Sequence, residues 1–267
     1  MTSTQNHPFD AALQFQYSNN RYQGKTSPDY ANMVGPFGGI TAAAMLKSML
    51  DHPDRQGDPI TLTVNFAAPI KDGDYEIEAQ ATRTGRSTQH WFGTMRQGDE
   101  IVTTATAVFA IRRETWGATD LHPPAMSDLT KRFSTGVMPP WTEQYRFHMA
   151  HDMADIMSDD SPTSETVQSI QDNPPRPLDF LSLTAMSDVF IPRIFVRRGG
   201  FVPAGTVAFT VYFHTDSAAL AEHGDAGMVG RARANRFYNR FFDQSAEIWT
   251  PSGDLLATSN QIVYFKE

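Results

Sequence analysis

Two kinds of hydrophobic pattern alternate along the chain, and the same succession occurs twice. In the first half, a glycine turn leads into a continuous apolar stretch, GPFGGITAAAMLKSML (35–50), which predicts a buried helix. Segments of alternating apolar and polar residues follow and predict strands; they are ITLTVNFAAPI, DYEIEAQATRT, TQHWFGTMRQ and EIVTTATAVFAIRR. Gly98 and Asp99 separate the last two segments and predict a hairpin turn.

The second half repeats this order. PLDFLSLTAMSDVFIPRIF (177–195) predicts a helix that continues to Pro192, and three strand-like segments follow it: TVAFTVYFHTD, the long RARANRFYNRFFDQSAEIWT, and LLATSNQIVYFKE. Local matches support the repeat, since LTVNF (62–66) resembles FTVYF (209–213) and QGDEIVTTATAVF (97–109) resembles SGDLLATSNQIVY (252–264). A repeated helix-plus-sheet unit of this size predicts two packed copies of one α+β module.

The expected modules comprise residues 1–112 and 141–267. Residues 113–140 between them are rich in Pro, Ser and Thr, which is typical of a surface linker. The 267 residues suit one large domain or two of ordinary size, and the chain can bury a substantial core.

Net charge and the lack of cysteine exclude or disfavour several classes of partner and site. A net charge of −8 disfavours a nucleic-acid or anionic-membrane partner, and the absence of Cys excludes disulfides, zinc–thiolate sites and a thiol nucleophile. The polar N-terminus lacks a secretory pattern and no apolar run reaches the length of a membrane span, so we expect a soluble, cytoplasmic protein. His148 and His151 form the only close histidine pair, and a metal site is not expected.

Asp188 is the first candidate for chemistry. On a continuous helix it shares a face with Leu181 and Thr184, and that face should be buried. A buried carboxylate requires partners. Asp188 therefore either caps a local turn at the helix end or serves as a desolvated group that activates water or orients a substrate.

Three further positions join the candidates. Alternation along the strand GTVAFTVYF places Thr206 and Thr210 on one face, opposite Phe209. Gln261 in the last strand shares a face with Val263, so its amide is either hydrogen-bonded in the core or lies in an adjoining pocket.

Gly38 and Gly39 precede the first helix. Glycines at a helix N-terminus allow close backbone approach and leave N–H groups that favour a carbonyl or oxyanion, although Gly-Gly is also a good turn.

The arginine run in GRARANRFYNRFF admits two interpretations. The arginines (Arg231, Arg233, Arg236 and Arg240) either line the solvated faces of a strand, or one or two of them bind phosphates of a nucleotide-containing ligand.

Together these residues resemble the double-hotdog acyl-CoA thioesterases, specifically the acyl-CoA thioesterase II group. The resemblance covers about residues 15–112 and 141–267, and its marks are GPFGG, PLDFLSLTAMSDVF, GTVAFTVYFH and ATSNQIVYF. It implies an α+β fold of two hotdog modules, each a long helix wrapped by an antiparallel sheet. Family members hydrolyse acyl thioesters without a cofactor, so the substrate implied is acyl-CoA or another acyl thioester.

The resemblance also implies the site. The family's water-positioning Asp, Thr and Gln fall on Asp188, Thr206 and Gln261, with Thr210 as the alternative threonine, while Gly38 and Gly39 match the backbone donors to the thioester carbonyl. The T-x-D-H pattern that the family often carries is absent from this strand, so both threonines stay open.

Two other functions remain open on the same fold. One is a hydratase or dehydratase of acyl thioesters, which generally needs a His that is not found beside Asp188 in the helix sequence. The other is a non-catalytic acyl-thioester-binding protein. Hotdog modules usually pair through edge strands, so the resemblance also implies a homo-oligomer, a dimer or larger.

Overall fold

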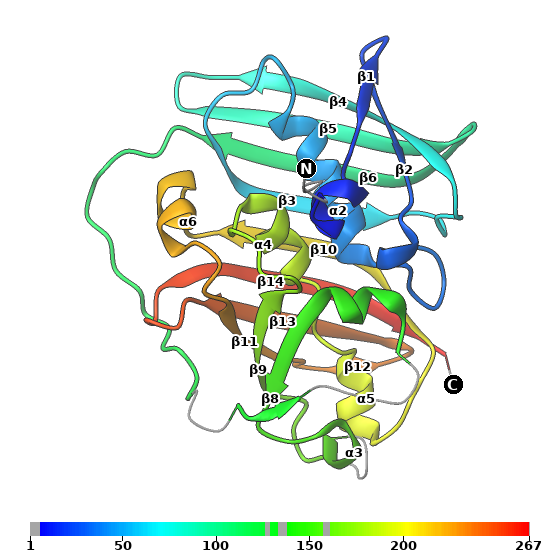
Figure 1. The fold of residues 1–267 in the computed structure, drawn as a ribbon, viewed down its shortest axis with the longest axis vertical. Helices are drawn as coiled ribbons and strands as arrows, with labels where there is room; N and C mark the ends of the chain where they lie inside the picture. The colour runs from blue at the N-terminus through cyan, green and yellow to red at the C-terminus, as the bar shows by residue number, and fades with distance from the viewer. Residues whose placement is uncertain (1–5, 126–128, 133–137, 157–160, 267) are drawn as a thin grey trace, which may run out of the picture.

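The computed structural model describes residues 6–125, 129–132, 138–156 and 161–266, shown in Figure 1. The first half contributes six strands: β1 (Gln16–Ser18), β2 (Arg21–Lys25), β3 (Asp58–Phe66), β4 (Asp74–Thr84), β5 (Thr88–Gln97) and β6 (Glu100–Ala110). The second half contributes β7 (Lys131–Arg132), β8 (Tyr145–Met149), β9 (Thr166–Asp172), β10 (Ala204–Phe213), β11 (Met228–Arg233), β12 (Phe237–Tyr238), β13 (Phe241–Trp249) and β14 (Leu255–Phe265). The paired strands are antiparallel and belong to one sheet.

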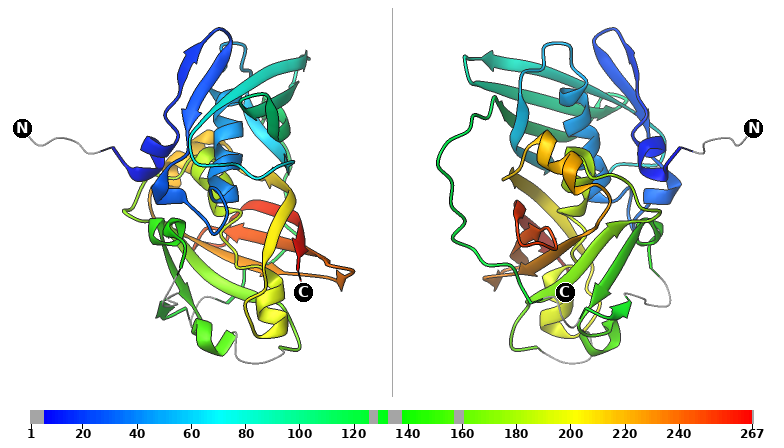
Figure 2. Two further views of the ribbon diagram at one scale, coloured as in Figure 1. Left: turned by 90° about the vertical axis from the view of Figure 1, so that its right-hand side faces the viewer. Right: turned by 60° about the vertical axis from the view of Figure 1, so that its left-hand side comes forward.

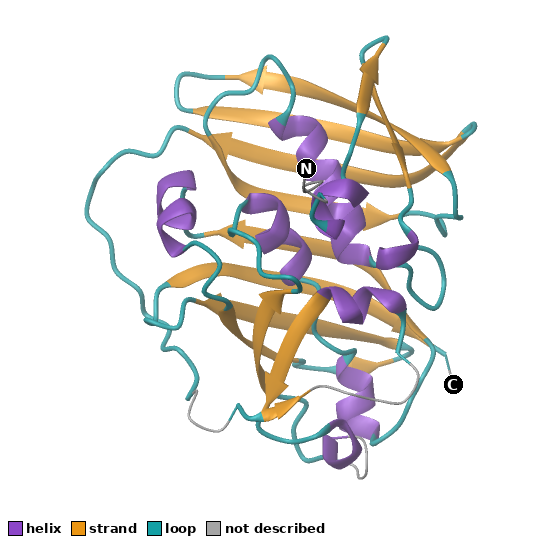
Figure 3. Cartoon of the chain, viewed as in Figure 1, coloured by secondary structure: helices purple, strands orange, loops and turns teal. Residues whose placement is uncertain are grey.

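Figure 3 distinguishes the helices from the strands by colour. The α-helices are α1 (Pro8–Ala12), α2 (Gly38–Leu50), α3 (Met153–Ile156), α4 (Phe180–Met186), α5 (Arg193–Arg198) and α6 (Ser217–His223). Two short 3₁₀ helices are η1 (Pro28–Tyr30) and η2 (Pro140–Gln144). The strands curl around α2 and α4, which pack against each other (Figure 2).

The strand order has a pseudo-twofold symmetry centred between β3 and β10. Outward from the centre, one half runs β3-β6-β5-β4-β2-β1 and the other β10-β14-β13-β11-β9-β8. The two halves join where Asn65 lies opposite Ala208 and Thr61 opposite Tyr212. This arrangement confirms the prediction of two packed copies of one α+β module.

The two central helices approach closely at the beginning of α2, where a Cβ atom on Gly39 would lie 2.5 Å from the Ala185 carbonyl oxygen of α4. Ala42, Ala43 and Ala44 of α2 are buried, and the inner faces of the strands surround them with larger apolar residues. One cluster of buried apolar residues includes members of both halves, so one continuous core crosses the boundary between the modules.

The second helix ends earlier than its sequence pattern predicts. Helix α4 begins with a capping box of Asp179 and Ser182 and ends at Met186 rather than at Pro192. The Ser187 hydroxyl donates to the Leu183 carbonyl, and Pro192 disfavours helical backbone at the residue before it. Asp188 therefore lies in the turn after α4 and not within the helix.

The long segment RARANRFYNRFFDQSAEIWT forms three strands rather than one. Asn239 and Arg240 adopt left-handed backbone conformations with φ of 48° and 68°, and they form the turn between β12 and β13. A further difference between the halves is α6, which lies between β10 and β11. The corresponding segment of the first half, between β3 and β4, is a short loop.

Residues 111–125 run along the outside of the molecule, on the left in Figure 1, without forming helix or strand. Within the predicted linker, positions 126–128 and 133–137 lie outside the described residues, and Lys131 and Arg132 form β7 against β8. None of the helices in the described part combines the length and hydropathy that crossing a membrane requires.

Candidate active site

Asp188 lies between the end of α4 and the beginning of α2, at the boundary of the two modules. Its Oδ1 accepts a hydrogen bond of 2.7 Å from Nε2 of Gln261 on β14. The carboxylate also accepts the backbone N–H of Gly39, in the first turn of α2. The positive end of the α2 dipole therefore faces the carboxylate.

Gln261 connects Asp188 to β10. Its Oε1 accepts a 2.9 Å hydrogen bond from the Thr206 hydroxyl, while its amide nitrogen donates to Asp188. The two bonds fix the orientation of the amide, which is 5% exposed. The structure thus brings Asp188, Gln261 and Thr206 into one hydrogen-bonded chain.

The two candidate threonines lie on opposite faces of the sheet, so the prediction of a shared face is wrong. The register of β10 against β14 shifts between Thr206 and Ala208, which leaves Val207 as a bulge residue with 42% exposure. Beyond the bulge the alternation is reversed. Thr210 consequently points away from Gln261, and its hydroxyl lies 3.0 Å from that of Thr63.

Burial changes the acidity of Asp188. Removal of the carboxyl group from water raises its pKa to about 7, while the hydrogen bonds from Gln261 and Gly39 act in the opposite direction. A carboxyl group with this pKa can accept and release a proton near neutral pH.

Glycine is required at positions 38 and 39 because neighbouring atoms approach both backbones closely. A Cβ atom on Gly38 would lie 2.6 Å from Oδ2 of Asp188, and one on Gly39 would lie 2.5 Å from the Ala185 carbonyl oxygen. The sequence identified both positions as donors to a carbonyl. In this structure, however, the N–H of Gly39 donates to Asp188.

Two serines that the sequence analysis did not single out hold this site together. Ser259 donates from Oγ to the Ser187 carbonyl at 3.0 Å, which ties β14 to the turn carrying Asp188. Ser259 is two residues before Gln261, so alternation alone places both on the inner face.

The histidines lie elsewhere. His214 is at the far end of β10, where Nε2 lies 3.0 Å from the Thr258 hydroxyl, and it lines an open cavity of about 1040 Å³ beneath the linker. Nδ1 of His148 lies 3.3 Å from Ser169 Oγ. Among the described residues, no group of three or more His, Cys, Asp or Glu side chains is arranged to hold a metal ion.

At the described positions that correspond to the polar chain, the first module has apolar residues. The strand pair β3–β6 corresponds to β10–β14, so Leu62 and Ala107, which lie opposite each other, correspond to Phe209 and Gln261. The register shift after Pro59 likewise corresponds to the one after Thr206. Counted from the residue that precedes each helix, Asp188 corresponds to Leu46. The counterparts are therefore Leu46 for Asp188, Pro59 for Thr206 and Ala107 for Gln261.

The two joined modules and their shared sheet are those of a double-hotdog protein. A crystal structure from Alicyclobacillus acidocaldarius, described as a conserved protein of unknown function with hot dog fold, is 45% identical with a TM-score of 0.93, covering 98% of this chain and 99% of that one. Two structures at lower identity share the fold. The tesB protein of Mycobacterium avium subs paratuberculosis (18% identity, TM-score 0.77) covers 97% of this chain and 98% of its own. The acyl-CoA thioesterase II TesB2 of Mycobacterium marinum (17%, 0.75) has the same coverage.

Family models identify both modules. The model of the acyl-CoA thioesterase N-terminal domain matches residues 27–110, and that of the C-terminal domain matches residues 118–265. No curated protein matches the chain. The chain belongs to the acyl-CoA thioesterase family.

Proposed function

We propose that the protein hydrolyses acyl-CoA to a free carboxylic acid and CoA, with Asp188 as the base that activates water. The observation that carries this proposal is the hydrogen-bonded chain from Thr206 through Gln261 to Asp188, held against the N-terminus of α2. A thioester is already activated toward attack, so hydrolysis requires an oriented water, a base and polarisation of the carbonyl, and not a covalent nucleophile.

Each residue has a distinct role in this reaction. Ionised Asp188 removes a proton as the water oxygen attacks the thioester carbonyl carbon, and the C–S bond breaks as the tetrahedral intermediate collapses. The proton held by Asp188 then passes to the departing sulfur. Gln261 holds Asp188 in position, and the Thr206 oxygen retains lone pairs that can accept a hydrogen bond from the water.

The N-terminus of α2 polarises the substrate carbonyl. Because Gly39 already donates to Asp188, the remaining N–H groups of the first turn, including that of Gly38, face the developing negative charge. The absence of a side chain at Gly38 leaves space beside Oδ2 of Asp188.

The polar partners of Asp188 favour hydrolysis over the hydratase reaction. They are an amide and a backbone N–H, and neither can exchange a proton with a substrate carbon near neutral pH. A non-catalytic binding protein of the same fold would have no need for a desolvated carboxyl group oriented in this way.

The test is release of CoA from short, medium and long acyl-CoAs, followed with a thiol reagent. We expect release by the wild type and its loss in Asp188→Asn, with Asp99→Asn in an exposed turn as the matched control. Equal rates in wild type and Asp188→Asn contradict the assignment of the base. Tight acyl-CoA binding without release by the wild type identifies a binding protein, and hydration of enoyl-CoA identifies a hydratase.

A further inference from the structure

The structure divides the four arginines of the run at 231–240 into two pairs. Arg231 and Arg233 both bond the buried carboxylate of Glu247, and Arg233 does so at 3.3 Å. Their charges are compensated within the fold. This pair therefore has a structural role on β11 and β13.

Arg236 and Arg240 have no such compensation. Within the described part of the chain, neither guanidinium forms an ion pair with a carboxylate. Asp243, the acid beside them, accepts hydrogen bonds from the backbone N–H of Arg236 and from Asn235. Arg240 lies in the left-handed region at φ 68°, at a turn position where Gly is preferred.

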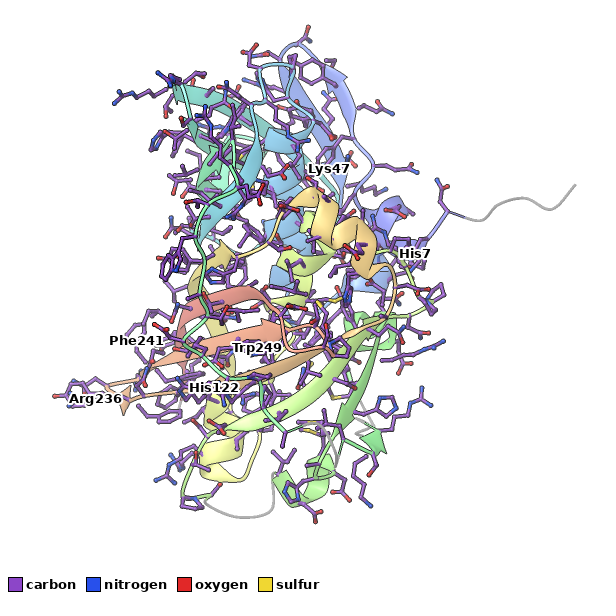
Figure 4. All side chains as sticks on the ribbon, turned by 90° about the vertical axis from the view of Figure 1, so that its left-hand side faces the viewer. His7, Lys47, His122, Arg236, Phe241 and Trp249 are labelled. Atoms are coloured by element: carbon purple, nitrogen blue, oxygen red, sulfur yellow. The ribbon has the colours of Figure 1, made fainter. Side chains whose placement is uncertain are left out.

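Exposed aromatic rings lie beside these two charges. Tyr238 is 59% exposed and its ring lies 4.4 Å below the guanidinium of Arg236. Phe241 is 44% exposed and packs against Tyr264 with ring centroids 5.4 Å apart. Figure 4 shows Arg236 and Phe241 at the end of a hairpin that projects from the body of the molecule. Guanidinium groups beside open aromatic faces suit a ligand with both phosphates and a base.

The hairpin lies at the same end of the sheet as the candidate active site. Gly205, adjacent to Thr206, is opposite Tyr264, and Tyr264 is opposite Phe241. Two strand spacings therefore separate Gly205 from the base of the hairpin, or about 10 Å across the sheet. Phe241 and Tyr264 lie on the outer face of the sheet, whereas Val263, opposite Thr206, lies on the inner face, so a ligand that reaches both must pass the end of the strands. CoA carries its nucleotide on a long flexible pantetheine arm, which is able to extend over this separation.

We propose that the hairpin from Arg236 to Phe241 binds the phosphorylated adenosine end of a CoA thioester. Arg236 and Arg240 bind the phosphate groups, and the exposed rings of Tyr238 and Phe241 offer faces for the base. This inference rests on the proposed hydrolysis of acyl-CoA and assigns the residues that bind the nucleotide of that substrate. An acyl group on the phosphopantetheine of a carrier protein lacks the nucleotide, so the hairpin favours CoA.

The test compares an acyl-CoA with the S-acyl-pantetheine of the same acyl chain, which has no nucleotide. In the double variant Arg236→Glu/Arg240→Glu, we expect KM for acyl-CoA to rise by about tenfold or more, since charge-assisted contacts to phosphate are lost. The value of kcat and the KM for S-acyl-pantetheine stay unchanged. Arg83→Glu/Arg86→Glu makes the same change of charge on the exposed β4–β5 region and leaves both KM values as in the wild type.

Either an equal rise in KM for both substrates or no rise for acyl-CoA overturns the hairpin proposal. Calorimetric titration with CoA itself separates this failure from failure of the proposed function. Loss of CoA binding in the double variant supports the hairpin even if the wild type hydrolyses nothing. Hydrolysis by the wild type, with unchanged CoA binding by the double variant, refutes the hairpin alone.

Discussion

The two modules have the same strand order but differ at the three positions that form the polar chain. The second module has Asp188, Thr206 and Gln261, joined by hydrogen bonds. At the corresponding positions the first has Leu46 and Ala107, both buried in the core, and Pro59. The comparison shows that the same strand order accommodates apolar side chains at these positions in one module and a hydrogen-bonded polar chain in the other.

The beginnings of the two central helices differ in a complementary way. Residue Phe37, before α2, makes no side-chain hydrogen bond to the helix, whereas Asp179, before α4, accepts the N–H of Ser182 and is paired with Arg176. The N-terminus of α4 is therefore closed by its own carboxylate. The N-terminus of α2 remains open to a carboxylate from the other module, and Asp188 occupies that place.

Replacing Asp188 by the residue at the corresponding position of the first module should have the largest effect on activity. Asp188→Leu places there the residue found at position 46 and removes the base. We expect kcat for acyl-CoA to fall by about 10²- to 10⁴-fold, the usual contribution of a general base. The folded state is checked by circular dichroism, with Asp99→Leu as a control at an exposed turn. A rate within threefold of the wild type excludes Asp188 as the base.

The reverse substitution tests whether the first module tolerates a carboxylate. Leu46 is 0% exposed, and the position lacks counterparts of Gln261 and Thr206. An unpaired buried charge is strongly unfavourable, so Leu46→Asp should reduce the free energy of unfolding by about 3–5 kcal/mol in urea denaturation. Leu50→Asp, at a partly buried position, should cost less. An unchanged midpoint for Leu46→Asp contradicts the interpretation of that position as closed core.

The pH dependence sharpens the comparison, because only the second module carries a titrating group at this position. In the proposed reaction Asp188 acts when ionised, and burial raises its pKa to about 7. The value of kcat/KM should therefore fall by about tenfold per pH unit below that pKa and level off above it. The measurement is the pH profile with one acyl-CoA. A plateau that extends down to pH 5 is incompatible with a base of this pKa.

The smallest expected effect separates the two threonines. Thr206→Val removes one neutral hydrogen bond to Gln261, which is worth ~0.5–1.5 kcal/mol, so kcat should fall by about twofold to tenfold. Thr210→Val is the matched control on the outer face and should leave kcat unchanged. An equal loss in both variants would mean that the bulge does not divide their roles.

Much of the architecture could be predicted because hydrophobic period and turn residues are local signals. Alternation identified the main strands, Gly98–Asp99 identified a hairpin, and the repeat predicted the pseudo-symmetric halves. Asp188 and Gln261 stood out as polar residues on faces that had to be buried. Their proximity, in contrast, depends on pairing between distant segments.

The errors arose where partner strands override the local pattern. The residues near Val207 do not predict a bulge, because the register of β10 is set by β14, which is more than 40 residues further along the chain. The buried pair of Asp172 and Tyr145, opposite each other on β9 and β8, was missed for the same reason. Burial raises the pKa of Asp172 to about 7, yet its segment TVQSIQD has an ordinary strand pattern.

The junction of β3 and β10 within a single chain has a consequence for inheritance. In an assembly of identical subunits, every mutation occurs at both copies of a site, so a base gained on one side is also gained on the other. Here each half is encoded separately, and a codon change at 188 leaves 46 as it was. Tandem duplication thus permits one half to be selected for reactivity and the other for rigidity.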